Sequence, residues 1–471
     1  MRGKLTFSSQ RPAVSRVLNR VDTGTRQAAA ATLLMVASLY SYGQENGESI
    51  GQATDTTDNY SFLAAQIDSG EADVVLNQVD TLITQIEAVH HRYHPDLLTP
   101  LTLRGDAHMA MDEPEKAIEA YSRARHVARV SNGLFDSSQI NVIYREADAF
   151  RALGDLATTA KREEYAYEVA RRAHDEYAPA LLAPLDRLAN FYVETDNPLA
   201  ARTLLNRAYL IHQANDTHFK PEVVPVLRGI ANTHRLERFP AVYVDNSDVN
   251  QLEGPQTGLI NGDLDNSYLT INSFPHGERA LQSVVEVQRQ LAGRNSEQEL
   301  DAILELADWH LLFGRNSSAT TLYEHVYLKM DESGRDAQAF FAKPHLLHFP
   351  RPMFPKSPPV SVRGDLVQGN VALEFAVSST GKVRNLQTVA NEGPRNMIFR
   401  TRRSIREATF RPRLEAGLPV RAEAQPFKFE FPYYTRTDRP APNAEQADNV
   451  PAATNPEDVS EAAEEPSEEA L

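Results

Sequence analysis

The sequence predicts a multidomain protein, in which an all-α solenoid of helix pairs is followed by a small α+β domain of ββαβ order. Two patterns predict this fold class. Similar residues recur every 42 positions over much of the chain, and near the C-terminus large apolar residues alternate with polar ones. The 471 residues also include no cysteine, which excludes a disulfide scaffold, a thiolate nucleophile and cysteine-type zinc sites.

The helical repeat is visible as sets of positions that recur in steps of 42 residues. Small residues at one position let two helices approach closely, and large ones fill the groove between neighbouring pairs. The small residues of the first helices are Gly105, Ala147, Ala189 and Ala231, the large ones are Leu101, Ile143, Leu185 and Leu227, and the small residues of the second helices are Ala124, Ala166 and Ala208. The pattern resembles the tetratricopeptide repeat, which implies a curved solenoid that binds a peptide or a helix of another protein in its groove. A spacer without a ligand is the alternative.

The solenoid is expected to span residues 59–340, with an irregular insertion near 236–280. Leu306–His310 matches Leu188–Tyr192 at an offset of 118, and this offset is not a multiple of 42. The insertion accounts for the difference. We expect five helix pairs, or six if a diverged pair around Phe62–Ala88 caps the stack.

Residues 361–436 are expected to form the α+β domain, and its first half is typical of a β-hairpin. Apolar residues alternate with small or charged ones along 369–377, as in a strand with one buried face. Gly381 lies in a turn that reverses the chain into a second strand over 382–389.

The second half of this domain holds a helix and a closing strand. Residues 397–408 are rich in helix formers, and Pro412 cannot continue a helix. The closing strand alternates charged residues with Phe427, Phe429 and Phe431. In this order the elements resemble the C-terminal domain of TonB, the protein that pulls on outer-membrane receptors from the periplasmic side. The resemblance covers about 85 residues.

The resemblance implies a small sheet whose exposed edge accepts an extended receptor segment as an added strand. The matching positions lie in the last strand and in the segment before the helix, and an arginine cluster on the helix could meet a carboxylate-bearing partner. The candidate partner-binding residues are Gln387, Thr388, Val389, Phe427, Phe429, Phe431, Arg402, Arg403 and Arg406. Two alternatives stay open: some of the phenylalanines face the core, and the arginines form a solvated helix face.

The N-terminal residues 1–43 combine six basic residues with an uncharged, mostly apolar run of 13 residues. This is typical of a cleaved secretory signal, and a short membrane anchor is the alternative. Residues 44–58 are expected to form a flexible linker, and the proline-dense residues 341–360 a second linker.

Charge is unevenly distributed over the C-terminal quarter of the chain. Residues 348–434 carry 14 Lys and Arg against 7 Asp and Glu, whereas residues 440–471 carry 9 acidic residues and no basic one. Residues 437–471 are therefore expected to be a disordered acidic tail. Nucleic-acid binding is not expected, because the basic region is small.

No motif indicates catalysis or a cofactor. The sequence lacks a Walker-type phosphate loop, a Gly-x-Ser-x-Gly elbow, a His-Glu-x-x-His motif and a Rossmann glycine pattern. His90 and His94 lie one helical turn apart, but no third ligand is evident, so no metal is expected. Glu163 and Glu164 are interpreted as a solvated face, and Trp309 as a core residue.

These observations predict a binding protein rather than an enzyme, in the periplasm, with inner-membrane association if residues 1–43 are retained as an anchor. In TonB-type envelope transport, the C-terminal domain would contact an outer-membrane receptor or envelope partner by strand addition. The repeats would recruit another protein. A structural scaffold unrelated to energised uptake is the alternative, because the repeat stands where the family has a proline-rich rod.

Overall fold

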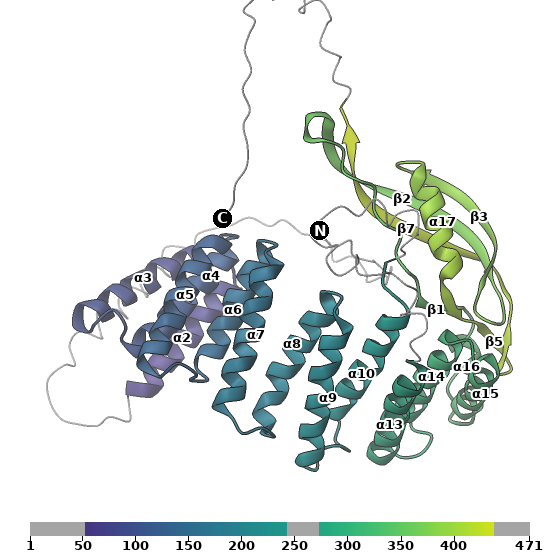
Figure 1. Cartoon of the computed structure of the whole chain (residues 1–471), viewed down its shortest axis with the longest axis horizontal. Coiled ribbons are helices and arrows are strands. Elements are labelled where there is room, and N and C mark those ends of the chain that lie inside the picture. The colour runs from purple at the N-terminus through teal and green to yellow at the C-terminus, as the bar shows by residue number, and fades with distance from the viewer. Residues whose placement is uncertain (1–51, 243–272, 438–471) are drawn as a thin grey trace, which may run out of the picture.

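The computed structural model of the chain describes residues 52–242 and 273–437. Figure 1 shows a row of helices stacked in an arc, with a twisted sheet and one further helix at its C-terminal end. The predicted signal or anchor, most of the predicted insertion and nearly all of the acidic tail lie outside the described residues. In the part of the chain that is described, no helix combines the length and the apolar character that a membrane crossing requires.

The helices of the described residues form six consecutive pairs, so the upstream pair that was predicted as an alternative is present. The pairs are α2 (Gln52–Asp68) with α3 (Ala72–Val89), α4 (Leu98–Ala110) with α5 (Pro114–Ser131), α6 (Gln139–Ala152) with α7 (Leu156–Ala173), α8 (Leu182–Glu194) with α9 (Pro198–Ala214), α10 (Val223–Arg238) with α13 (Phe274–Ala292), and α14 (Glu297–Leu312) with α15 (Asn316–Glu332). Short 3-10 turns, η1 (Pro95–Leu97) and η2 (Pro179–Leu181), precede α4 and α8. Because α2 begins at Gln52, part of the segment 44–58 is helical and not a linker.

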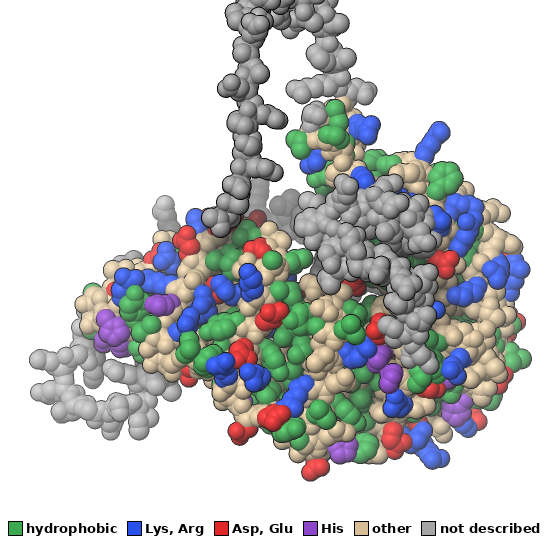
Figure 2. All heavy atoms as spheres, in the orientation of Figure 1, with side chains coloured by type: hydrophobic (Ala, Val, Ile, Leu, Met, Phe, Trp, Pro, Cys, Tyr) green, Lys and Arg blue, Asp and Glu red, His purple; other side chains and the backbone are tan. Residues whose placement is uncertain are grey.

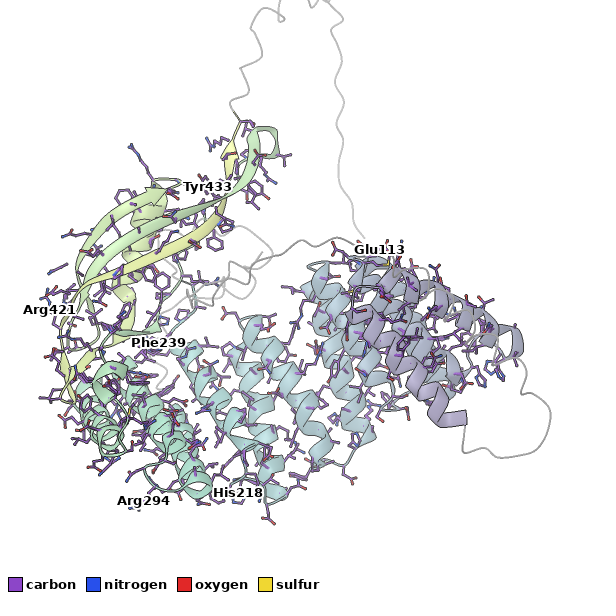
Figure 3. The ribbon with its side chains drawn as sticks, turned by 180° about the vertical axis from the view of Figure 1, so that it is seen from behind. Glu113, His218, Phe239, Arg294, Arg421 and Tyr433 are labelled. Atoms are coloured by element: carbon purple, nitrogen blue, oxygen red, sulfur yellow. The ribbon has the colours of Figure 1, made fainter. Side chains whose placement is uncertain are left out.

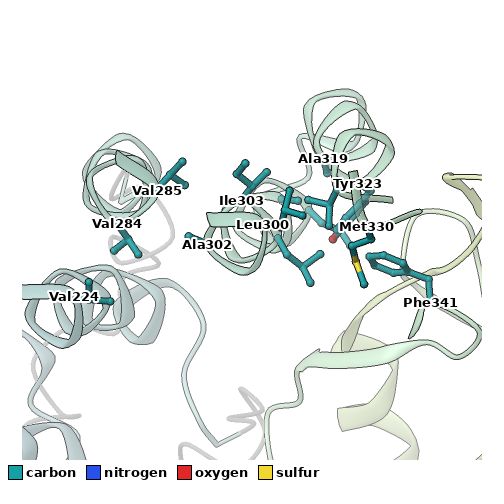
Figure 4. Packing of buried hydrophobic residues seen from close by; sticks show 14 of the residues in the cluster. Val224, Val284, Val285, Leu300, Ala302, Ile303, Ala319, Tyr323, Met330 and Phe341 are labelled. Atoms are coloured by element: carbon teal, nitrogen blue, oxygen red, sulfur yellow. The ribbon is translucent and has the colours of Figure 1, made fainter. Parts of the chain in front are cut away.

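The repeated small and large residues form the core of the solenoid, as predicted. Ala147, Ala189 and Ala231 are buried, and so are the large residues that lie four positions before each of them. At the equivalent Gly105, a Cβ atom would lie 2.2 Å from the ring of Tyr121. Only glycine therefore lets α4 and α5 approach as closely as they do. Figure 4 shows how the last pairs continue this packing through Leu300, Tyr323 and Met330 to Phe341.

The C-terminal domain has the predicted ββαβ order. Its main sheet has the strand order β3-β2-β7, with β2 (Arg363–Val377) between β3 (Val383–Glu392) and β7 (Ala422–Arg436), and both neighbours pair with β2 antiparallel. Helix α17 (Asn396–Glu407) packs on β2 and β3 and buries Met397 and Ile405. Three short strands follow the helix: β4 (Thr409–Arg411), β5 (Arg413–Glu415) and β6 (Leu418–Val420).

The interpretation of residues 341–360 as a linker is wrong, because much of this segment is packed against both domains. It follows the one-turn helix α16 (Ala337–Phe340) and contains β1 (His345–His348), which pairs with β4. Phe349 and Phe354 pack against the core of the C-terminal domain, and Phe341 is buried in the core of the last helix pairs. The prolines take part in this packing, since Pro350, Pro352 and Pro358 are buried while the two phenylalanines are half-buried.

An ion pair joins the two domains at a position that belongs to the repeat. Asp308 on α14 receives two hydrogen bonds from Arg411 on β4, at 2.9 Å from Nε and 2.5 Å from Nη2, and both side chains are 13% exposed. Within the solenoid, Asp106 pairs with Arg145, and Asp148 pairs with Arg187, each arginine lying 39 residues after its aspartate. Arg411 thus pairs with Asp308 as Arg145 and Arg187 of the following helix pairs do with Asp106 and Asp148. At this position the C-terminal domain supplies the contact that a further helix pair would supply.

The seam between the domains contains an uncharged histidine, which makes stability depend on pH. Burial lowers the pKa of His348 on β1 to about 4, and the nearby positive charges of Arg235 and Lys382 act in the same direction. The ring of His348 also contacts that of Phe239 at 5.4 Å between centroids. In the unfolded chain this histidine has its ordinary pKa of 6.5. As the pH falls, the unfolded chain therefore binds a proton at this residue before the folded chain does. The stabilisation is fully present above pH 6.5 and is lost as the pH falls toward 4.

We therefore expect the Tm to fall between pH 7 and pH 5, and to fall less in a His348→Phe variant, which keeps a ring against Phe239 but cannot titrate. Thermal unfolding followed by circular dichroism at several pH values measures this. His234, whose pKa burial also lowers to about 4, contributes to the fall in both proteins. An identical fall in the variant and the parent would show that His348 does not contribute.

Candidate functional site: the open edge of the C-terminal sheet

One face of the main sheet is the core of the C-terminal domain. Val371 and Leu373 of β2 are 0% and 1% exposed, and in register opposite them on β7 lie Phe429 and Phe427. Phe429 is 2% and Phe431 0% exposed, whereas Phe427 is half-buried against Phe349. The alternation of the sequence is therefore an alternation between this core and the opposite, polar face.

Strand β7 pairs with β2 on one side only and has no partner on its other side among the described residues. Figure 3 shows Arg421, just before β7, and Tyr433, near its far end, so that the strand runs along the length of the sheet. In Figure 1, β3 lies on the outer side of the sheet, away from the middle of the arc. The free main-chain groups of β7 are thus those of an edge strand, the feature that accepts an added strand.

Two prolines determine which residues of β7 direct their main-chain groups outward. The ladder is continuous from Gln368 opposite Pro432 to Glu374 opposite Pro426. Residues of an antiparallel pair alternate between positions that bond to the partner strand and positions that point away from it, and proline fits only the second kind. The two prolines are six residues apart and share one parity, which is also the parity of Lys428 and Glu430.

Lys428 and Glu430 therefore point their N–H and C=O groups away from β2, into the open edge. Each offers one donor and one acceptor, and the two prolines add a carbonyl each, so the stretch 426–432 presents two donors and four acceptors. The side chains of Lys428 and Glu430 form an exposed ion pair at 2.8 Å on the polar face. The hydrogen bond to Glu430 raises the pKa of Lys428. A short extended segment could pair with this stretch without displacing any β2 bond.

The other edge, β3, is irregular in the middle of the strand, where its register with β2 shifts twice and Asn385 has a positive φ of 53°. Strand β7 also has two register shifts and a positive φ at Ala424, but these lie outside its continuous stretch 426–432. Arg402 of α17 donates to the Thr388 hydroxyl at 3.0 Å and to the Leu386 carbonyl at 3.4 Å. Bulges of this kind and an occupied carbonyl are ways in which an edge strand is closed to pairing. Of the two edges, β7 is the one suited to strand addition.

The structure separates the residues that were predicted as one partner-binding site. Gln387, Thr388 and Val389 lie on β3, and Phe427, Phe429 and Phe431 lie on β7, with β2 between them. The alternative that some of the phenylalanines face the core holds for Phe429 and Phe431, whose buried side chains are not available to a partner. Their main chains remain part of the accepting strand.

The predicted arginines differ in their surroundings. Arg402 holds β3 as described above, and so it is structural. The neighbouring Arg400, which is not among the predicted residues, donates to the carbonyls of Met353 and Phe354 at 3.1 Å and is structural too. Arg403 and Arg406 are exposed on α17, near Phe399, whose side chain is 73% exposed. Figure 2 shows that Lys and Arg side chains are frequent over the C-terminal domain.

Sequence reasoning missed Pro426, Lys428, Glu430 and Pro432 as the residues that define the edge. A signal was available, because two prolines of equal parity in a predicted strand indicate which main-chain groups face outward.

The histidines near the first turn have a neighbour that the sequence did not suggest. Helix α3 ends at Val89, so His90 and His94 lie in a turn and not on one helix, and Asp96 brings a third ligand atom within 4.8 Å of theirs. The rings of His90 and His94 are stacked, with centroids 4.0 Å apart and planes 14° apart. Lone pairs of nearly parallel rings do not converge on one ion, so this arrangement would need to change before it could hold a metal.

The C-terminal domain matches a known family of domains in sequence. Residues 359–431 match the family described as Gram-negative bacterial TonB protein C-terminal. They form a TonB C-terminal domain. The matched segment contains β2, β3, α17 and β7 as far as Phe431, so that Pro432 lies just beyond it, and the family is one of the Gram-negative cell envelope. No curated protein shows significant similarity to the sequence.

The helical region is similar to several solved structures of repeat proteins. One is a structure of the nearly identical TPR-like repeats of a kinesin light chain from Podosopora anserina. It shares 16% sequence identity with this chain, with a TM-score of 0.36, over 52% of this chain and 99% of its own. BtubC (BKLC) from P. vanneervenii shares 12% identity, with a TM-score of 0.37, over 63% of this chain and 98% of its own. The apo form of RapI shares 8% identity, with a TM-score of 0.36, over 61% and 79%. At these scores the likeness adds nothing to what the helix pairs themselves show.

Proposed function

We propose that this protein is an adaptor of the cell envelope and not an enzyme. The β7 edge of its TonB C-terminal domain binds an extended segment of an outer-membrane receptor or another envelope protein as an added strand, in TonB-type transport. The solenoid recruits a second protein. The observation that carries the proposal is the open stretch of β7 between Pro426 and Pro432, where Lys428 and Glu430 face away from β2.

The connection between the domains supports an adaptor. The pair of Arg411 with Asp308, the strand β1 and the buried Phe341 fix the C-terminal domain on the last helix pair. Two partners bound to the two domains would consequently be held in a fixed relation. We place the protein in the periplasm, where a receptor segment is accessible to a TonB C-terminal domain.

Strand addition predicts a specific response to proline at the edge. Replacing Glu430 by Pro removes an outward N–H but no bond to β2, since neighbouring positions of the same parity already hold proline. We expect Glu430→Pro to weaken binding of a peptide that copies the periplasm-facing segment of an outer-membrane receptor by about tenfold or more, because hydrogen bonds are lost and the added ring obstructs pairing. Fluorescence anisotropy with a labelled peptide measures this.

Glu430→Ala is the matched control, since it removes the same carboxylate and keeps the N–H. Its affinity should stay within about threefold of the parent, because the ion pair it removes is exposed. Equal losses in both variants would show that the side chain, and not the main chain, binds the peptide. If neither variant changes the affinity, or no receptor peptide binds, a scaffold unrelated to energised uptake becomes the better explanation.

A further inference from the structure

The helical region carries a small hollow that the edge of the sheet does not involve. It lies between α6 and α8, the first helices of two neighbouring pairs, and has a volume of about 300 Å³. Its lining includes Asp148, Arg151, Asp186, Asn190 and Glu194. Such hollows along the first helices of a solenoid are where a side chain of an extended partner can be held.

The arginines of the hollow are already engaged. Arg187 donates to Asp148 at 2.8 Å and to both oxygens of Glu163 at 2.9 and 3.0 Å. Arg151 donates to Glu194 at 2.9 Å and lies 3.6 Å from Glu163. Glu163 is 0% exposed, so its interpretation as a solvated residue is wrong: it is the buried anchor of both arginines. Neither cation is available to an anionic ligand without breaking these bonds.

One carboxylate of the hollow is left without a cation. Asp186 is exposed and accepts a hydrogen bond from the Asn190 amide at 3.1 Å, and no ion pair joins it to any other described residue. No other side chain or main-chain group of the described residues donates a hydrogen bond to it. A carboxylate in this state favours a ligand that brings a positive charge.

Asn190 interrupts the series of Asp–Arg pairs along the solenoid. It stands at the repeat position of Asp148, and Gly229 stands at the position of Arg187. A Cβ atom at residue 229 would lie 3.0 Å from a methyl group of Leu205, so a larger side chain would be crowded there. Residue 229 therefore places no arginine side chain over Asn190, and the exposed amide of Asn190 can bond to the main chain of a ligand.

We propose that this hollow binds the Lys or Arg side chain of an extended segment of a protein partner, with Asp186 as the charged acceptor. The inference rests on the proposed role of the solenoid in recruiting a protein, and it adds the chemistry of that protein. The net charge agrees with a basic partner, since residues 59–340 carry 42 Asp and Glu against 25 Lys and Arg. This field would also accelerate association at low salt.

The experiment uses the full chain and a set of nine-residue peptides that differ only in the central residue, which is Arg, Lys, Gln or Glu. We expect the Arg and Lys peptides to bind about tenfold more tightly than the Gln and Glu peptides in fluorescence anisotropy at low salt. In Asp186→Asn this preference should disappear. In the control Glu119→Gln, which removes an exposed charge from α5, the preference should remain. Circular dichroism confirms that both variants are folded.

Equal binding of all peptides, absence of binding, or a preference that persists in Asp186→Asn would overturn the inference. These results would not affect the strand-addition proposal, because the β7 variants are tested with a receptor peptide at a different surface. Conversely, loss of receptor binding would leave the result on Asp186 intact.

Discussion

Replacing Arg411 by Ala is expected to reduce the free energy of unfolding by about 3–5 kcal/mol. The change leaves Asp308 nearly buried, and among the described residues its one remaining donor is the Tyr323 hydroxyl at 2.8 Å. A carboxylate that loses its cation in such a place keeps its desolvation cost without the compensating attraction. Because the pair joins the domains, we also expect the C-terminal domain to unfold separately from the solenoid. Urea denaturation followed by circular dichroism, with tryptophan fluorescence of Trp309 as the probe of the solenoid, measures both effects.

The control for this prediction is another pair at the same repeat position. Arg145 and Asp106 are joined at 2.7 Å, but their side chains are 35% and 24% exposed, so Arg145→Ala should cost only about 1 kcal/mol or less. A second control, Asp308→Asn combined with Arg411→Ala, removes the unpaired charge and should recover part of the loss. If Arg411→Ala and Arg145→Ala reduce the free energy of unfolding equally, the pair of Arg411 with Asp308 does not stabilise the contact between the domains as described above.

Replacing Gly277 by Ala is the second change expected to have a large effect, a destabilisation of about 2 kcal/mol or more. A Cβ atom there would lie 2.1 and 2.2 Å from two ring atoms of Trp309. The indole cannot easily retreat, since it is 3% exposed, donates to the Phe274 carbonyl at 3.2 Å and packs on Phe313. The overlap should exceed the gain of about 1 kcal/mol that alanine brings to a helix. Thermal and urea unfolding measure the result.

Gly229→Ala provides the comparison. Its added methyl group would meet a flexible Leu205 side chain at 3.0 Å, so a change of about 1 kcal/mol or less in either direction is expected. A Gly277→Ala protein as stable as Gly229→Ala would mean that α13 and α14 tolerate a wider separation than the structure shows.

The solenoid could be predicted because its core is periodic. Residues such as Ala147 and Ala189 are buried at the same position of successive helix pairs. The need for a small residue at that position therefore recurs at a fixed spacing in the sequence. The hairpin, helix and closing strand of the C-terminal domain could be predicted from their local alternation. No repeat reveals the position of Arg411 or of β1, since each contacts residues that are distant in sequence.

The candidate site was predicted only in part, for a physical reason. Alternation along β7 shows that Phe427, Phe429 and Phe431 share a face, but it does not show whether that face meets a helix or a partner. In the structure, Phe429 and Phe431 are buried in the core. The groups that would pair with an added strand are main-chain N–H and C=O groups, and because nearly every residue type carries both, the sequence does not reveal them. Only the pairing partners of a strand distinguish an open edge from a covered one.

The most direct test of strand addition uses the absence of natural cysteine from the chain. A single cysteine at position 428 would be offered a receptor peptide in which cysteine is moved one residue at a time. Disulfide formation requires Cβ atoms about 4 Å apart, so an added strand should give yields that alternate with a period of two along the peptide. The same peptides should give low, unpatterned yields with a single cysteine at position 387 on β3. Unpatterned yields at 428, or equal patterns at both edges, would contradict the account.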